Sequence, residues 1–122
     1  MSKILISIKP KYVEKIFNGS KKYEYRTKLA KKDVDKLIVY CTSPVKRVIG
    51  EVDVTDTITC SPERLWEETS EYSGVSKTDF DNYFEKRSDA CAYVLGKITR
   101  FKKPKLLEEY GIEAAPQTYY YL

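Results

Sequence analysis

The eight residues from Gly19 to Arg26, with the sequence GSKKYEYR, constrain the fold of this chain more than any other stretch. Gly19 follows an apolar stripe with helical spacing and is a natural helix end, because glycine enters the left-handed conformation without steric cost. The alternation of charged residues and tyrosines that follows predicts a strand, whose side chains point alternately to opposite faces. We therefore expect charged residues on one face and tyrosines on the other: Lys22, Glu24 and Arg26 against Tyr23 and Tyr25.

The other periodic segments predict mainly strands. Alternating or continuous apolar runs predict strands at 3–8, 35–42, 45–59, 90–101 and in the tail 114–122, and helical spacing predicts a helix at 10–18. Gly50 predicts a bend in the long strand that contains it. Ser61 and Ser76 are caps of two further short helices, which form an insertion at about 61–87.

This order of elements predicts an α+β fold that is mainly β. The strands are expected to form a small, mostly antiparallel β-barrel with short helices covering its openings. The 122 residues are expected to form a single domain spanning residues 1–122. Tyr119–Tyr121 and Trp66 are expected in the core, and the acidic residues near Asp53 on the surface.

Composition excludes several kinds of chemistry. The chain contains no histidine, which removes Ser-His-Asp and Cys-His catalysis and the commonest metal ligand. The three cysteines are scattered and lack C-x-x-C spacing, so neither a zinc site nor any other metal or cofactor is expected. The formal charge of +4 permits binding to nucleic acid without requiring it.

The same features predict a cytoplasmic protein without a membrane segment. An odd number of dispersed cysteines is typical of free thiols in a reducing compartment. No apolar run approaches the roughly 18 residues needed to cross a bilayer. The first residues lead directly into the first predicted strand and do not resemble a signal peptide.

The opening stretch also carries a spaced motif, G-x-K-x-x-E-x-R, formed by Gly19, Lys21, Glu24 and Arg26. In this respect the chain resembles the ASCH domains, relatives of the PUA and EVE folds. The resemblance extends through most of the chain, in segments 6–10, 40–44, 48–52 and 115–119. It implies a PUA-like β-barrel with a basic cleft beside the first helix, where the motif residues gather.

The resemblance further implies a function in binding RNA or a modified nucleotide. Some members of the family are enzymes, namely a ribonuclease and an amidohydrolase that removes the acetyl group from N4-acetylcytidine. That amidohydrolase uses a lysine, a threonine and a downstream glutamate. Lys21 matches the lysine, but Glu24 stands where the threonine is. If the chain is an enzyme, it is therefore expected to be a metal-independent hydrolase with Lys21 and Glu24 as catalytic residues.

The candidate ligand-binding residues come from the motif and from two segments expected beside it. Arg26 can present its planar fork to a phosphate or a base edge, with Glu24 orienting it, although a purely structural ion pair is an alternative. Lys21 can contact a phosphate or act as a base, or can be a surface lysine at a turn. The remaining candidates offer a tyrosine ring for stacking, an ammonium, hydroxyls and an amide, and they are Tyr40, Thr42, Ser43, Lys46, Gln117 and Thr118.

Ordinary structural roles are the alternatives for these flanking residues: turn formation for Ser43, and capping of the tail strand for Gln117 and Thr118. Three functions therefore remain open from the sequence. The first is an RNA-binding or nucleotide-binding module, the second is a hydrolase, and the third is a protein-interaction domain that uses the helices at 61–87. The oligomeric state is not specified.

Overall fold

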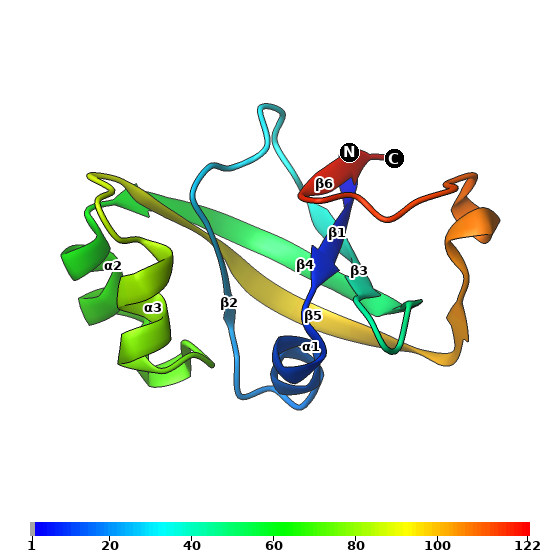
Figure 1. The fold of residues 1–122 in the computed structure, drawn as a ribbon, viewed down its shortest axis with the longest axis horizontal. Coiled ribbons are helices and arrows are strands. Elements are labelled where there is room, and N and C mark those ends of the chain that lie inside the picture. The colour runs from blue at the N-terminus through cyan, green and yellow to red at the C-terminus, as the bar shows by residue number, and fades with distance from the viewer. Residues whose placement is uncertain (1) are drawn as a thin grey trace.

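The strands form one mixed six-stranded sheet that curves into a half-barrel (Figure 1). A computed structural model describes residues 2–122, and Met1 lies outside the described residues. Within the sheet, β1 (Lys3–Ile8) and β3 (Lys36–Cys41) are parallel and the other pairs are antiparallel. The predicted α+β, mainly β fold with short helices is confirmed. The strands lie in the order β2 (Tyr23–Arg26), β5 (Ala90–Lys105), β4 (Arg47–Cys60), β3 (Lys36–Cys41), β1 (Lys3–Ile8) and β6 (Tyr119–Tyr121).

The longest strands are irregular where the sequence predicts a bend. Val39 faces Gly50 and Tyr40 faces Val48, so Ile49 is an extra residue on β4. A β-bulge of this kind increases the local twist and lets a sheet curve. β5 is longer than the predicted strand at 90–101, because the polar residues 102–105 continue it.

Three α-helices and two 3-10 helices complete the fold: α1 (Pro10–Phe17), α2 (Pro62–Thr69), η1 (Ser70–Tyr72), α3 (Lys77–Tyr83) and η2 (Leu107–Tyr110). Both predicted caps are confirmed. The hydroxyl oxygen of Ser61 accepts a hydrogen bond from the Arg64 amide at 3.3 Å, and that of Ser76 from the Asp79 amide at 3.0 Å. Figure 1 shows α2 and α3 together at one end of the molecule, with β2 running between them and α1.

One face of β2 packs on the hydrophobic cluster of the helical segment, the two short helices at about 61–87. Tyr25 packs with Phe80 and Phe84 of the helical segment, and Tyr23 lies against the same cluster. Glu24 and Arg26 point instead toward β1, as the alternation predicts. Lys22 precedes the strand and departs from the predicted face, since its ammonium lies 4.2 Å from the centre of the Tyr72 ring.

The C-terminal tail pairs with β1 as an edge strand, which brings the two ends of the chain together (Figure 1). The expectation of three core tyrosines here is wrong. Tyr119 is half-buried, but Tyr120 and Tyr121 are 44% and 40% exposed. The reason is that β6 has a neighbouring strand on one side only, so a large part of the surface of Tyr120 and Tyr121 stays in solvent.

Candidate functional site

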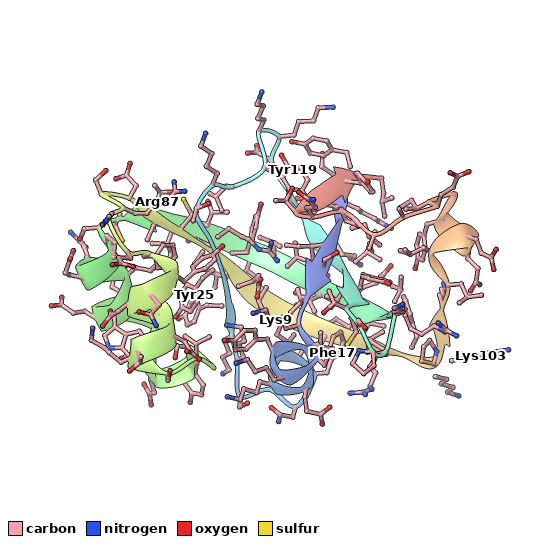
Figure 2. All side chains as sticks on the ribbon, in the orientation of Figure 1. Lys9, Phe17, Tyr25, Arg87, Lys103 and Tyr119 are labelled. Atoms are coloured by element: carbon pink, nitrogen blue, oxygen red, sulfur yellow. The ribbon has the colours of Figure 1, made fainter. Side chains whose placement is uncertain are left out.

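A cleft of about 460 Å³ opens between α1, β2 and α3. It contains the three polar side chains of the spaced motif and a ring of tyrosines and lysines from the surrounding elements. Figure 2 labels Lys9 and Tyr25, which come from the start of α1 and from β2. The lining residues are Ser7, Ile8, Lys9, Lys11, Tyr12, Lys21, Glu24, Tyr25, Arg26, Val75, Asp79, Phe80, Asn82 and Tyr83.

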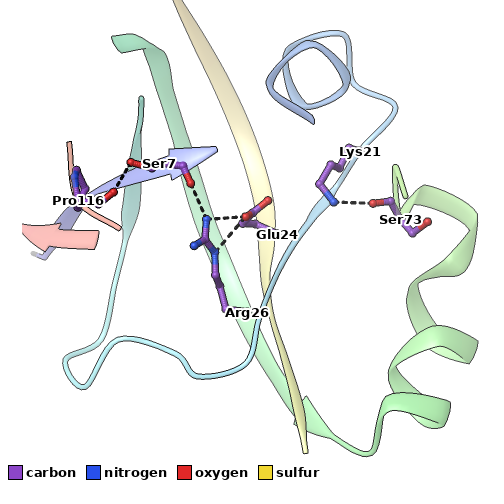
Figure 3. Close-up of polar contacts among 6 residues, drawn as sticks. All are labelled: Ser7, Lys21, Glu24, Arg26, Ser73 and Pro116. Atoms are coloured by element: carbon purple, nitrogen blue, oxygen red, sulfur yellow. Dashed lines mark hydrogen bonds and ion pairs between the residues drawn. The ribbon is translucent and has the colours of Figure 1, made fainter. Parts of the chain in front are cut away.

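Glu24 and Arg26 form an ion pair on one face of β2, in which Glu24 is buried and Arg26 is half-buried (Figure 3). Arg26 donates to a single oxygen of the carboxylate, Oε2, from Nη2 at 2.9 Å and from Nε at 3.1 Å. Nη2 also donates to the carbonyl oxygen of Ser7 on β1, at 2.9 Å. Charge-assisted bonds of this kind are short and directional. The pair therefore connects β2 to a strand that is not its neighbour in the sheet.

Lys21 lies two residues before β2 and is only 2% exposed. Its ammonium donates to the carbonyl oxygen of Ser73 at 2.7 Å (Figure 3). The same ammonium lies 4.8 Å from the ring centre of Tyr25 and 5.3 Å from that of Tyr12. One carbonyl and two aromatic faces thus replace the water that normally surrounds a lysine. The surface-lysine alternative for Lys21 is excluded by this burial.

Burial lowers the pKa of Lys21 from 10.5 to about 8. Loss of hydration is the largest cause, because a charged ammonium is disfavoured away from water. The Glu24 carboxylate opposes this effect and raises the pKa, whereas the positive charges of Lys15 and Arg26 lower it further. Near pH 8 about half of the Lys21 side chains are therefore neutral and able to accept a proton.

The lowered pKa of Lys21 predicts that stability rises with pH between about 8 and 10. In this range the unfolded chain keeps the Lys21 proton and the folded chain releases it, so raising the pH favours the folded state. The expected gain is about 2 kcal/mol in the free energy of unfolding, at about 1.36 kcal/mol per pKa unit. Urea denaturation at several pH values measures it.

Lys21→Met is the control for this pH dependence, because other groups titrate in the same range. Burial raises the pKa of Tyr25 to about 12, so Tyr25 lowers stability as the pH rises above 10. This contribution is shared by both proteins and cancels in their difference. If the free energy of unfolding changes with pH by the same amount in wild type and in Lys21→Met, Lys21 is not the titrating group.

A tight turn on the helical segment presses against Lys21. Gly74 has a φ of +69°, and a Cβ atom placed there would lie 2.5–2.7 Å from the Cβ, Cγ and Cδ atoms of Lys21. The preceding residue, Ser73, supplies the carbonyl that binds the Lys21 ammonium. Lys15 of α1 donates to the Gly74 carbonyl oxygen at 3.1 Å. This turn therefore fixes Lys21 by both shape and hydrogen bonding.

The spaced motif and the cleft agree with a match to a family of known proteins. The family model described as ASCH domain matches residues 6–105, which include the motif and every residue that lines the cleft. The chain belongs to the ASCH domain family.

The relatives of this ASCH domain include longer proteins. The chain is 34% identical over 121 residues to the large ribosomal subunit protein uL22 of Ureaplasma parvum serovar 3, covering 98% of this chain and 39% of that protein. It is 28% identical over 92 residues to an ASCH domain-containing ribonuclease of Zymomonas mobilis, covering 75% of this chain and 62% of that protein. The chain thus spans about two fifths of the length of the first relative and three fifths of the second.

A solved structure shares the fold. The crystal structure of ASCH from Zymomonas mobilis superposes with a TM-score of 0.90 at 24% sequence identity, covering 98% of this chain and 87% of that one. At this identity the similarity establishes the architecture of the sheet and helices.

The ASCH cleft brings together three of the nine predicted site residues, Lys21, Glu24 and Arg26. Tyr40 is buried in a separate hydrophobic cluster with Leu5 and Val48. The other five lie at the ends of strands outside the cleft lining: Thr42 is half-buried, and Ser43, Lys46, Gln117 and Thr118 are exposed. Gln117 and Thr118 follow Pro116, whose carbonyl oxygen accepts a hydrogen bond from Ser7 of the cleft at 2.8 Å.

Sequence reasoning missed the residues that α1 and the helical segment bring to the cleft. The start of α1 supplies Lys9, Lys11 and Tyr12, and α3 supplies Asn82 and Tyr83. The helical segment also supplies the turn at Ser73 and Gly74. The glycine after Ser73 was an available signal for a tight turn. No local signal indicated that this turn, about fifty residues away in sequence, would pack on Lys21.

Two further observations concern residues 2–122 as a whole. Within this range no three His, Cys, Asp or Glu side chains are grouped in a way that could hold a metal ion. In the same described range, no helix is both long enough and apolar enough to cross a membrane.

Proposed function

We propose that this ASCH domain binds RNA or a modified nucleotide in the cleft beside its spaced motif. The observation that carries the proposal is the group of buried Lys21, buried Glu24 and half-buried Arg26 in a cleft that is also lined by exposed lysines and one exposed tyrosine. The name of one relative, an ASCH domain-containing ribonuclease, supports a role connected with RNA. The ligand is proposed to contact Lys21, Glu24 and Arg26.

The composition of the cleft supports a nucleotide ligand. Its lining contains four cations, Lys9, Lys11, Lys21 and Arg26, against two carboxylates, Glu24 and Asp79. The excess of positive charge favours a polyanion. Tyr83, which is 47% exposed, offers a ring face at the mouth of the cleft, and stacking on such faces binds unpaired bases. In this proposal Tyr83 takes the stacking role first assigned to Tyr40.

The proposal also gives the helical segment at about 61–87 a purpose. Within a single domain of residues 1–122, this insertion forms one side of the cleft through α3 and holds Lys21 through the Ser73–Gly74 turn. A longer RNA strand that leaves the cleft at Ser7 would meet the exposed Gln117 and Thr118.

Binding to short single-stranded RNA is expected to weaken steeply as salt is raised, because phosphate contacts release counterions. Lys9→Ala should weaken binding and reduce the slope of log K against log salt by about 1. Fluorescence anisotropy with a labelled RNA measures both quantities. Lys28→Ala is the matched control, since Lys28 is also exposed but lies outside the cleft lining. Absence of binding at micromolar protein would contradict the proposal.

A hydrolase acting on RNA or on an acylated nucleoside is the second candidate. The lowered pKa of Lys21 favours it, because a lysine with a pKa of about 8 can accept a proton near neutral pH. Glu24 also lines the cleft and is the acid closest to this lysine in sequence. In such an enzyme Lys21 would act as the base, without a metal ion.

The hydrolase candidate predicts turnover of N4-acetylcytidine or degradation of total RNA. The rate should rise with pH through about 8, as Lys21 loses its proton. Chromatography of the nucleoside and gel electrophoresis of the RNA provide the two measurements. Activity that persists in Lys21→Met would exclude this mechanism. Unchanged substrates would leave the binding function as the better account.

A further inference from the structure

The ion pair at the base of the cleft leaves two polar atoms without protein partners. Both hydrogen bonds from Arg26 to Glu24 end on Oε2, and among residues 2–122 Oε1 of Glu24 accepts none. Over the same residues, Nη1 of Arg26 likewise makes no hydrogen bond. Figure 3 shows both atoms without a dashed line. Since no fully buried side-chain nitrogen or oxygen in this range lacks a partner, Oε1 and Nη1 are both solvent-accessible.

A bound group must satisfy the free carboxylate oxygen. The Glu24 residue is 6% exposed, so few waters can reach Oε1 and a ligand that covers it must donate a hydrogen bond. A phosphodiester group of RNA cannot do this, because its oxygens only accept hydrogen bonds and it carries the same charge as the carboxylate. Arg26 has also committed Nε and Nη2 to protein oxygens, so its fork cannot grip a phosphate in the bidentate manner.

We propose that the floor of the cleft, formed by Lys21, Glu24 and Arg26, binds the edge of a nucleobase and not a phosphate. Resting on the proposed function, this inference specifies which part of the nucleotide enters first. Oε1 of Glu24 accepts an N–H of the base. The cations on either side of Glu24 in the sequence, Lys21 and Arg26, donate to neighbouring carbonyl oxygens or ring nitrogens of the base.

The phosphate then lies at the rim of the cleft, formed by Lys9 and Lys11. Lys9 is exposed and makes no ion pair with any residue in 2–122. The Lys11 ammonium lies 3.8 Å from an Asp79 carboxylate oxygen, with both side chains more than half exposed, and such a contact is easily replaced. The cleft therefore separates a floor that recognises the base from a rim that recognises charge.

Pairs of nucleosides that differ in one N–H group of the base test whether the floor of the cleft recognises that group. Isothermal titration with uridine and 3-methyluridine, and with cytidine and N4,N4-dimethylcytidine, compares ligands that have or lack the donor. For whichever parent nucleoside binds, the methylated form is expected to bind about tenfold more weakly or worse, because Oε1 is left without a partner. Inorganic phosphate at millimolar concentration should not compete. Equal binding of the methylated form, or competition by phosphate, overturns the inference.

Two variants separate the floor from the rim. In Glu24→Gln the amide oxygen must face Arg26, so the amide N–H₂ faces the cleft and preference for the N–H nucleoside should vanish. Lys9→Ala should leave uridine binding unchanged while weakening uridine monophosphate severalfold. Circular dichroism confirms that each variant is folded. If Glu24→Gln does not fold, the titrations of the wild-type protein with the paired nucleosides are sufficient to support or overturn the inference.

This inference and the proposed function fail in different ways. RNA binding that is competed by inorganic phosphate, or that occurs without any nucleoside binding, keeps the proposed function and refutes base recognition by the floor. Absence of both RNA and nucleoside binding refutes both. Loss of discrimination in Glu24→Gln, with wild-type discrimination intact, supports base recognition by the Glu24 carboxylate.

Discussion

Replacing Arg26 with methionine is expected to lower the free energy of unfolding by about 3 kcal/mol. The substitution leaves the buried Glu24 carboxylate and the Ser7 carbonyl oxygen without their donor. Removing one partner of a buried ion pair typically costs 3–5 kcal/mol, and the partial exposure of Arg26 argues for the lower end. Urea denaturation monitored by tryptophan fluorescence measures the change.

The control for this substitution is the double variant Glu24→Leu, Arg26→Met. It removes both charges, so no uncompensated carboxylate remains buried, and most of the lost stability should return. A double variant that is as unstable as Arg26→Met alone would show that packing of the arginine, and not the unpaired charge, dominates. Because this experiment reads stability only, it is independent of any ligand.

Replacing Gly74 with alanine is expected to cost about 3 kcal/mol and to displace Lys21. The positive φ of +69° strains any residue with a Cβ by about 1 kcal/mol, and forcing a methyl group into a filled site adds a further 1–3 kcal/mol. The overlapping atoms are the Cβ, Cγ and Cδ atoms of a buried side chain, which cannot swing away as the tip of a surface lysine would. Thermal or urea denaturation measures the loss.

Gly19→Ala isolates the backbone part of this effect. Gly19 has a φ of +86°, but no atom lies within 4 Å of the position its Cβ would take. Because no residue other than its chain neighbours contacts this position, its substitution should cost about 1 kcal/mol from backbone strain. Equal losses in the two variants would mean that the contact with Lys21 contributes nothing. RNA affinity should fall in Gly74→Ala and stay near the wild-type value in Gly19→Ala, because only the first disturbs Lys21.

The local elements of the fold could be predicted because short-range rules control them. The hydroxyls of Ser61 and Ser76 cap the amides three residues later, and this depends only on adjacent backbone. Side-chain alternation along β2 sends Tyr25 and Glu24 to opposite faces whatever the strand pairs with. The exposure of Tyr120 and Tyr121 could not be predicted in the same way, because it depends on β6 lying at the edge of the sheet.

The sequence by itself determined that Glu24 and Arg26 share one face of a strand and that Lys21 stands at its entrance. Only the tertiary structure decided how deeply these residues are buried and which groups they contact. Ser73 and Gly74 pack on Lys21 from fifty-odd residues away, and burial lowers the pKa of this lysine, while the Ser7 carbonyl on β1 holds Arg26. The physical reason is that alternation is a property of neighbouring residues. Burial and electrostatic environment are set by whichever distant segments pack against them.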